Sequence, residues 1–259
     1  MQQLTNQFLP DLTPDLIRFK SVNLEQINKA KLMNRVDHKF VMSKNELFNI
    51  LPELHKNYFV LKIDGVFNHH YTSTYFDTHD LAMYYAHHNQ RANRFKIRQR
   101  FYHTTGDAFL EIKRKDNKGV THKSRTEVNQ VIDKIPYRQF DFVLGNSAYH
   151  PMALEAVMTN EFYRFTLVNK TFTQRITVDT GLRFFQNDNT VSLPDLVVTE
   201  VKSLRYNMDT TIFNLLDNFH IKPTGMSKYA VGMALLNPSL KQNLFKQKIN
   251  NLKTITHVA

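Results

Sequence analysis

Four cationic side chains recur at every second position between residues 94 and 100, and this spacing indicates a strand with one cationic face. They are Arg94, Lys96, Arg98 and Arg100, in the stretch RFKIRQR. Successive side chains of a strand point to opposite faces, so the four cations share a face and the apolar residues between them share the other. Arginine binds phosphate oxygens in a bidentate fork, and lysine adds a compact point charge. The pattern therefore predicts a surface for a phosphate-bearing anion.

The same two-residue spacing of charge occurs in five further stretches. In chain order these are Arg35/Asp37/Lys39, Glu111/Lys113/Lys115, Lys123/Arg125/Glu127, the weaker Arg175/Thr177/Asp179, and Glu200/Lys202. Neighbouring like charges on one face of a strand lie about 7 Å apart and repel by about 2 kcal/mol at an effective dielectric constant near 20. A bound polyanion would relieve this repulsion.

Strands and helices that could position these residues follow from the pattern of the whole chain. We predict strands at 35–43, 58–64, 70–78, 91–102, 107–115, 121–129, 161–169, 174–185 and 195–203. We predict helices at 24–33, 44–55, 80–88, 133–144, 150–158, 209–221 and 226–236. Ser43 and Glu46 have the spacing of a capping box, and DNKG after residue 115 is typical of a hairpin turn. The fold class is therefore α+β.

Two arrangements of these strands are consistent with the charge pattern. One is an open antiparallel sheet with a solvated charged face, which is common. The other is a closed barrel with the charges inside and the helices packed outside. Because unpaired buried cations are very costly, such an interior would be a wet channel for an anion.

Composition bounds the class of protein. The chain has 259 residues, of which 42% are hydrophobic, with a net charge of +11. The absence of cysteine excludes disulfides and thiolate metal sites. The sequence has no apolar run of 18 residues and no signal-peptide pattern, so we expect a cytoplasmic protein. We predict one domain over residues 1–259, with a core at about 20–237 and a polar tail at about 238–259.

The motifs RVDHKF, TYFDT, RFKIRQR, FLEIKRKDNKG, TEVK and GMSKY follow one another in the order seen in the VTC domain. Over about residues 20–237 the chain resembles this domain, which belongs to the triphosphate tunnel enzymes and is related to the CYTH phosphohydrolases and cyclases. The resemblance implies a closed, eight-stranded antiparallel barrel that forms a tunnel. It also implies binding of ATP or another triphosphate and of inorganic polyphosphate, with Mg²⁺ or Mn²⁺ as cofactor.

The resemblance further implies roles for individual residues. Lys39, Arg98, Arg100 and Glu200 are the expected catalytic residues, with Glu200 as the main metal ligand and Glu111 as a possible second ligand. The expected phosphate-binding residues are Arg94, Lys96, Lys113, Lys115, Lys123, Arg125, Arg175, Lys202 and Lys228. The hydrolase relatives open with Glu-x-Glu-x-Lys, whereas this chain has Arg35, Asp37 and Lys39. That departure favours the VTC branch.

Several functions stay open at this point. Transfer of a phosphoryl group from ATP to polyphosphate is favoured over hydrolysis of a triphosphate, and a sensor that binds without turnover is a third possibility. The chain lacks the membrane segments of eukaryotic polymerases, so export of the product would need a separate membrane partner. A nucleic-acid-binding module is disfavoured, because the aromatic residues are expected on the face opposite the cations.

Two features of the sequence are assigned structural roles and no part in catalysis or binding. The adjacent histidine pairs at 69–70 and 87–88 lack the spacing of a zinc site and are expected to be packing or surface residues. Asp77 is expected to bond nearby backbone at the end of a strand.

Overall fold

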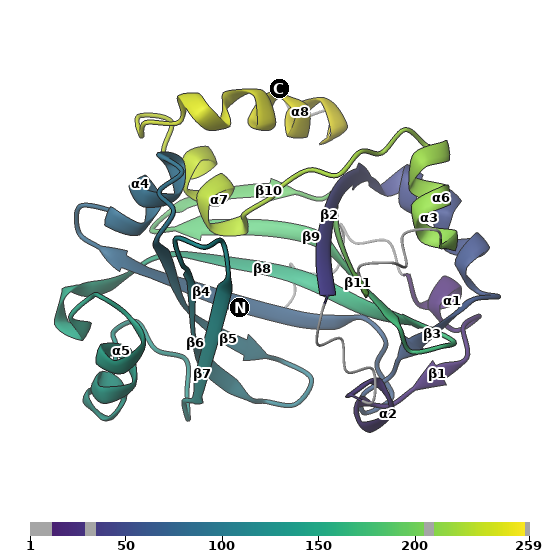
Figure 1. Cartoon of the computed structure of the whole chain (residues 1–259), viewed down its shortest axis with the longest axis horizontal. Helices are drawn as coiled ribbons and strands as arrows, with labels where there is room; N and C mark the ends of the chain where they lie inside the picture. Colours follow the sequence, from purple (N-terminus) through teal and green to yellow (C-terminus); the bar gives the residue numbers. More distant parts are fainter. Residues whose placement is uncertain (1–11, 29–34, 205–209, 257–259) are drawn as a thin grey trace.

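A large, curled antiparallel sheet with helices around it dominates the structure (Figure 1). The computed structural model describes residues 12–28, 35–204 and 210–256. Its strands are β1 Ser21–Val22, β2 Arg35–Ser43, β3 Tyr58–Leu61, β4 His69–Thr78, β5 Arg94–Tyr102, β6 Ala108–Lys115, β7 Thr121–Glu127, β8 Leu154–Asn169, β9 Gln174–Gln186, β10 Asn189–Leu193 and β11 Leu196–Leu204. Its α-helices are α1 Thr13–Leu16, α2 Leu24–Asn28, α3 Lys44–Leu54, α4 Ala82–His88, α5 Phe140–Asn146, α6 Thr211–Asn218, α7 Lys228–Leu236 and α8 Lys246–Thr256.

Across the described residues the sheet has eleven strands and is not closed, which corrects the prediction of a closed eight-stranded barrel. Eight strands follow one another in the order β2-β11-β9-β8-β4-β5-β6-β7, with antiparallel pairing throughout. The other three extend it: β10 pairs with β9, β3 pairs with the end of β8, and the two-residue β1 pairs with β3 in parallel. The end strands of the long path, β2 and β7, do not pair with each other.

The segment of residues 222–227, here called the bridging segment, contacts two strands that are not neighbours in the sheet. The backbone N–H of Thr224 donates to the carbonyl of Lys39 on β2, at 2.7 Å. From the other side, Lys96 of β5 donates to the hydroxyl of Ser227, at 2.9 Å. The segment thus links β2 to β5, which four strands separate in the order of the sheet, without strand pairing. It also leads into α7, whose first residue is Lys228.

Apolar side chains in two large clusters hold the helices against the sheet. One cluster packs α3 and α6 on β2, β9 and β11, with Phe40, Ile176 and Val201 at the sheet surface. A second cluster joins α4, α7 and α8 to β4, β5, β6 and β8. Register shifts in β8, opposite Tyr75/Phe76 and at Glu161/Tyr163, are irregularities of the kind that increase the local twist of a sheet.

Several local predictions are confirmed. The capping box before α3 is present, with the Glu46 carboxylate accepting from the Ser43 N–H at 2.6 Å and the Ser43 hydroxyl accepting from the Glu46 N–H at 3.2 Å. The DNKG turn joins β6 and β7, and Gly119 there has a positive φ of 81°, which glycine adopts without strain. The predicted helix at 24–33 is described only as far as Asn28, and its remainder lies outside the described residues.

The predicted helix at 150–158 is wrong. A short 3₁₀ turn at Pro151–Ala153 leads directly into β8, and Leu154 to Met158 belong to that strand. The pattern of the segment is ambiguous in sequence, and pairing with β4 on one side decides in favour of the strand. The strand β10, Asn189–Leu193, is a second difference, because we predicted no strand there.

The C-terminal tail is a docked helix. Ile249, Leu252 and Thr256 of α8 are buried against the rest of the protein, and α8 contacts β2 and β11. Within the described residues, no helix combines the length and apolarity that a membrane span requires.

Candidate functional site

The alternating charges predicted from the sequence lie in register across the sheet. The surface that they share is here called the interior face. On β5, β6 and β7, Lys96, Lys113 and Lys123 form one row, and Arg98, Glu111 and Arg125 form the next. On β2, β11 and β9, one row is Lys39, Glu200 and Thr177, and the next is Asp37, Lys202 and Arg175. The expected site residues on these strands therefore gather on one continuous face.

Two ends of the sheet face each other across this interior. Lys39 of β2 is close enough to Lys96 of β5 to help lower the pKa of Lys96. Glu200 of β11 is close enough to Lys113 of β6 to oppose the lowering of the pKa of Lys113. Neither pair consists of neighbouring strands, since three strands or more separate them in the sheet. The curl of the sheet therefore brings cations of both ends around a common space.

Glu111 is a buried anchor for two cations. Its side chain is fully buried, and one carboxylate oxygen accepts from Nε and Nη2 of Arg98 at 2.8 and 2.6 Å. The other oxygen lies 3.0 Å from Nζ of Lys123. Burial acts to raise the pKa of Glu111, but Arg98, Arg100 and Lys123 together hold it well below its ordinary value. The carboxylate stays ionised and fixes Arg98, which also reaches the hydroxyl of Tyr75 at 3.4 Å.

Lys96, Arg100 and Lys113 of the interior face form no ion pair with a carboxylate of the described residues. Lys96 bonds only the Ser227 hydroxyl, Arg100 lies 3.5 Å from the Ser73 hydroxyl, and Lys113 has no ion pair. Burial and the neighbouring charge of Arg98 lower the pKa of both lysines to about 7, and they lower the pKa of Arg100 as well. Each of these groups would be stabilised by an anion.

Glu200 lies in a second charged group, at the opposite end of the sheet. Its carboxylate pairs with Nζ of Lys202 and lies 3.4 Å from Nζ of Lys39. Lys202 in turn binds Asp37 at 2.9 Å. Although burial acts in the opposite direction, Lys202 and Lys39 hold the pKa of Glu200 far below its usual range. The Glu200 side chain keeps 21% of its surface exposed, so a solute can reach it.

A third charged group includes a residue that the sequence did not single out, Arg164 of β8. Its guanidinium holds Asp179 of β9 in a bidentate pair at 2.5 and 2.8 Å, and Lys228 of α7 binds the same carboxylate. Despite burial, Arg164 and Lys228 lower the pKa of Asp179 to about 2, and burial lowers that of Lys228 to about 8. Arg164 has no alternating charged neighbour on β8, so the spacing of charges could not reveal it.

The remaining expected phosphate-binding residues lie toward the margins of the interior face. Arg94 donates to the carbonyl of Arg91 at 2.7 Å, and half-buried Lys115 is its partner in the strand ladder. Arg125 is exposed and stacks over the ring of Phe109 at 4.7 Å. Half-buried Arg175 lies opposite Lys202.

The expectation that aromatic residues lie only on the opposite face is wrong. Tyr71 carries Arg100 and Arg164 over its ring at 5.7 and 5.4 Å, and Tyr75 lies beneath Arg98 at 6.0 Å. These tyrosines come from β4, whose residues were not part of the charge pattern. Their rings are covered by guanidinium groups, so they support the cations and do not offer free faces for stacking with bases.

Asp77 and the histidine pairs have the structural roles expected of them. The Asp77 carboxylate accepts from the N–H groups of Met83 and Tyr84 at 2.9 Å each and from the hydroxyl of Tyr229, and so holds the start of α4 against α7. His70 stacks on His103 and Tyr163 with ring centroids 3.9 and 4.8 Å apart. Among the residues that the structure describes, no three His, Cys, Asp or Glu side chains form a group that could hold a metal ion.

The two carboxylates expected to hold Mg²⁺ or Mn²⁺ differ in their fit. Magnesium is usually bound by one or two carboxylates together with substrate phosphates and water. Glu200 is ionised and partly exposed, so it fits this role with phosphates supplying the other ligands. Glu111 does not fit as well, because its side chain is fully buried and both oxygens face cations.

Comparison with known proteins bears on the same residues. Residues 34–237 match the model of the VTC domain. The chain belongs to the VTC domain family. The matched range includes every residue of the three charged groups, from Asp37 on β2 to Lys228 on α7. It ends before α8, so the C-terminal helix lies outside the part of the chain that the VTC domain model covers.

Solved structures similar to this VTC domain protein are distant in sequence. A putative adenylate cyclase from Vibrio parahaemolyticus is 13% identical, with 74% of this chain and 94% of that chain covered and a TM-score of 0.42. A putative adenylyl cyclase from Hippeastrum, reported to have a dominant triphosphatase activity, is 14% identical, with 76% and 94% covered and a TM-score of 0.45. A protein from Pyrococcus horikoshii is 12% identical, with 75% and 96% covered and a TM-score of 0.42. No curated protein matches the chain.

Proposed function

We propose that the interior face binds the triphosphate of ATP and the end of an inorganic polyphosphate chain, and that it transfers the terminal phosphoryl group of ATP to that chain. The observation that carries the proposal is that Lys96, Arg100 and Lys113, whose pKa values burial and Arg98 lower, have no carboxylate partner among the described residues. Their charges repel one another and the surrounding cations. The neutral hydroxyls of Ser227 and Ser73 that contact two of them do not compensate this repulsion. A polyphosphate supplies closely spaced negative charges that match such a face.

Phosphoryl transfer depends mainly on positioning and on neutralising charge, so the proposed roles are electrostatic. Arg98, fixed by Glu111, and Arg100, supported by Tyr71, offer guanidinium groups of set orientation to phosphate oxygens. Lys39, Lys96 and Lys113 add charge around the same space. A terminal phosphate oxygen of the polyphosphate attacks the γ-phosphorus of ATP. The bond from that phosphorus to the β–γ bridging oxygen breaks, and ADP leaves with the electron pair.

A divalent cation would be held by Glu200 together with phosphate oxygens, and it would neutralise charge on the transferring group. Lys39 and Lys202 now occupy the Glu200 carboxylate, so they would turn toward phosphate when metal binds. The nucleophile is already an anion, so the proposal assigns no general base. The proposal also includes a cytoplasmic location for the protein and a separate membrane partner.

The experiment incubates the purified protein with ATP and Mn²⁺ or Mg²⁺, with and without a short polyphosphate primer. Products are resolved by gel electrophoresis and by phosphorus NMR. We expect polyphosphate to lengthen as ATP is converted to ADP, and we expect Glu200→Gln to abolish this. Glu53→Gln is the matched control, because Glu53 is an exposed residue on α3, outside the interior face.

Other results would contradict the transfer reaction and point to a different use of the same face. Release of orthophosphate without growth of the chain would identify a triphosphatase. Binding of triphosphate without any turnover would identify a sensor. Binding that grows with the length of an oligonucleotide and needs no divalent cation would identify a nucleic-acid-binding protein.

A further inference from the structure

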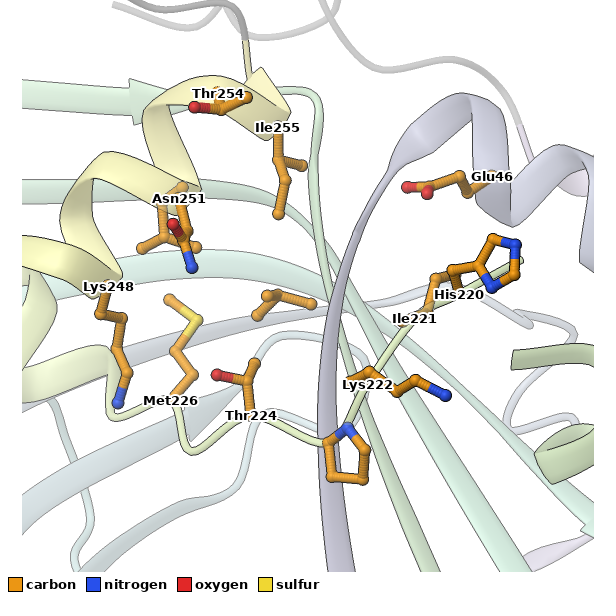
Figure 2. Close-up of a pocket in the computed structure, with 13 residues that line it drawn as sticks. Glu46, His220, Ile221, Lys222, Thr224, Met226, Lys248, Asn251, Thr254 and Ile255 are labelled. Carbon is orange, nitrogen blue, oxygen red and sulfur yellow. The ribbon is translucent and has the colours of Figure 1, made fainter. Parts of the chain in front are cut away.

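A pocket of about 510 Å³ lies between α8 and the bridging segment. Thr224 and Met226 of that segment line it from below, and Lys248 and Asn251 line it from α8 (Figure 2). In this view the side chains of Lys248 and Asn251 extend from the helix toward the bridging segment, with their nitrogen atoms leading. The pocket therefore has polar groups that can donate hydrogen bonds.

Lys248 is the lysine of this pocket that has no carboxylate partner among the described residues, whereas Lys222 pairs with Asp217. It is half-buried, and Nζ lies 3.8 Å from where a Cβ on Gly225 would be. It forms no ion pair with a carboxylate in the described part of the chain. Burial lowers its pKa. The carboxylate that lines the pocket, Glu46, accepts from the amide and hydroxyl of Ser43 in the capping box.

The pocket continues the interior face rather than lying apart from it. Val41, which lines the pocket, is two residues beyond Lys39 on β2 and so points to the same face of that strand. The bridging segment that forms one wall also holds Lys96 through Ser227. Burial and nearby cations, Lys248 among them, lower the pKa of Lys96, so the two ammonium groups act on each other.

We propose that this pocket binds the part of a polyphosphate chain that extends beyond the interior face, with Lys248 as its main phosphate contact. The inference rests on the proposed function and adds a determinant of chain length to it. Lys248 lies on α8, outside residues 34–237, so it would be a feature of this chain beyond its VTC domain. A triphosphate bound on the interior face would end before the pocket, whereas a longer chain would reach it.

Affinities for tripolyphosphate and for long-chain polyphosphate, measured by calorimetry without divalent cations, test the proposal. The variants are Lys248→Ala and Lys248→Arg, and the matched control is Lys253→Ala, an exposed residue of the same helix with the same charge. The wild-type protein should bind the long chain more tightly than tripolyphosphate. We expect Lys248→Ala to weaken long-chain binding about tenfold, the factor that one charge-assisted hydrogen bond contributes, and to leave tripolyphosphate binding unchanged. Lys248→Arg should restore the preference, and Lys253→Ala should behave like the wild type.

Three results would overturn the proposal while leaving the proposed function in place. They are a wild-type protein with no preference for the longer chain, an unchanged preference in Lys248→Ala, and an equal loss of both affinities in that variant. The last result would mean that Lys248 only adds positive charge near the interior face and does not contact the longer chain. Failure of the wild-type protein to bind tripolyphosphate would instead contradict the proposed function itself. Thermal unfolding of each variant confirms that the helix remains docked.

Discussion

Lys96 on β5 and Lys113 on β6 lie directly opposite each other in the antiparallel ladder, and neither has a carboxylate partner among the described residues. Lys123 of β7 continues the same row, and it forms an ion pair with Glu111. Like charges in directly opposed positions destabilise a sheet. The position of these two lysines is therefore unfavourable in the empty protein, and an anion between them would reverse that.

Replacing one of the two lysines should stabilise the empty protein and weaken its binding. Lys113→Met keeps the length of the side chain and removes the charge, so we expect the free energy of unfolding at pH 7 to rise by about 1 kcal/mol. Tripolyphosphate binding should fall at least tenfold, because one charge-assisted contact is lost. Thermal unfolding and calorimetry measure the two effects. The control is Arg114→Met, an exposed cation on the other face of β6, and equal effects of both variants would contradict the interpretation.

Burial of Lys113 and repulsion from Arg98 predict how that stabilisation depends on pH. The pKa of Lys113 is lowered to about 7 in the folded protein, against an ordinary value of 10.5. Between these two values the unfolded chain holds the proton that the folded protein has released, so the stability of the empty wild type rises with pH. The advantage of Lys113→Met should be largest at pH 7 and below and should fade as pH rises toward 10. An advantage that is constant with pH would show that burial of the lysine is not its cause.

Anion binding should show the opposite trend. A phosphate beside Lys96 and Lys113 favours their charged forms and raises their pKa from about 7, so binding above pH 7 requires uptake of protons. We expect the affinity for tripolyphosphate to decrease from pH 7 to pH 9. Calorimetry in two buffers of different ionisation enthalpy counts the protons directly. An absence of proton uptake at pH 8 would mean that the phosphates do not contact these lysines.

Glu111→Gln separates a positioning role from a role as metal ligand. The substitution leaves Arg98 and Lys123 without their buried carboxylate, so we expect stability to fall by about 3 kcal/mol. Tripolyphosphate without metal should then raise the melting temperature of the variant more than that of the wild type, because phosphate supplies the missing negative charge. Glu127→Gln, an exposed position on β7, is the control. Full stability combined with loss of metal-dependent turnover would instead assign Glu111 to the metal.

Gly232 allows α7 to approach the sheet closely. A Cβ at this position would lie 2.5 Å from both Sδ of Met158 and Cδ1 of Phe184. Gly232→Ala should therefore destabilise the protein by about 1–3 kcal/mol and displace Lys228 from Asp179. Gly145→Ala on α5 is the control, since a Cβ there would meet no atom within 4 Å beyond its own helix backbone and chain neighbours, and alanine favours a helix. Chemical denaturation compares the two, and equal stabilities would show that α7 has room to move.

The sequence by itself determined the strands that carry charge and the face on which the charges lie. Strand periodicity is local, so Arg94 to Arg100 and Glu111 to Lys115 could be assigned to one face from their spacing alone. The capping box of Ser43 and Glu46 and the turn at Gly119 are local for the same reason. The order of the motifs also sufficed for the VTC domain family, which the match over residues 34–237 confirms.

Only the tertiary structure decided which charges pair and which stay without a carboxylate partner. Asp179 pairs with both Arg164 and Lys228, and Lys96 bonds Ser227, so residues of separate strands and of the segment before α7 come together. Closure of the sheet was implied by the resemblance to the VTC domain, but closure depends on whether β2 and β7 pair, and they do not. Here the bridging segment contacts β2 and β5 instead. Long-range contacts of this kind depend on how the sheet curls and on the packing of helices against it, which no local pattern of residues encodes.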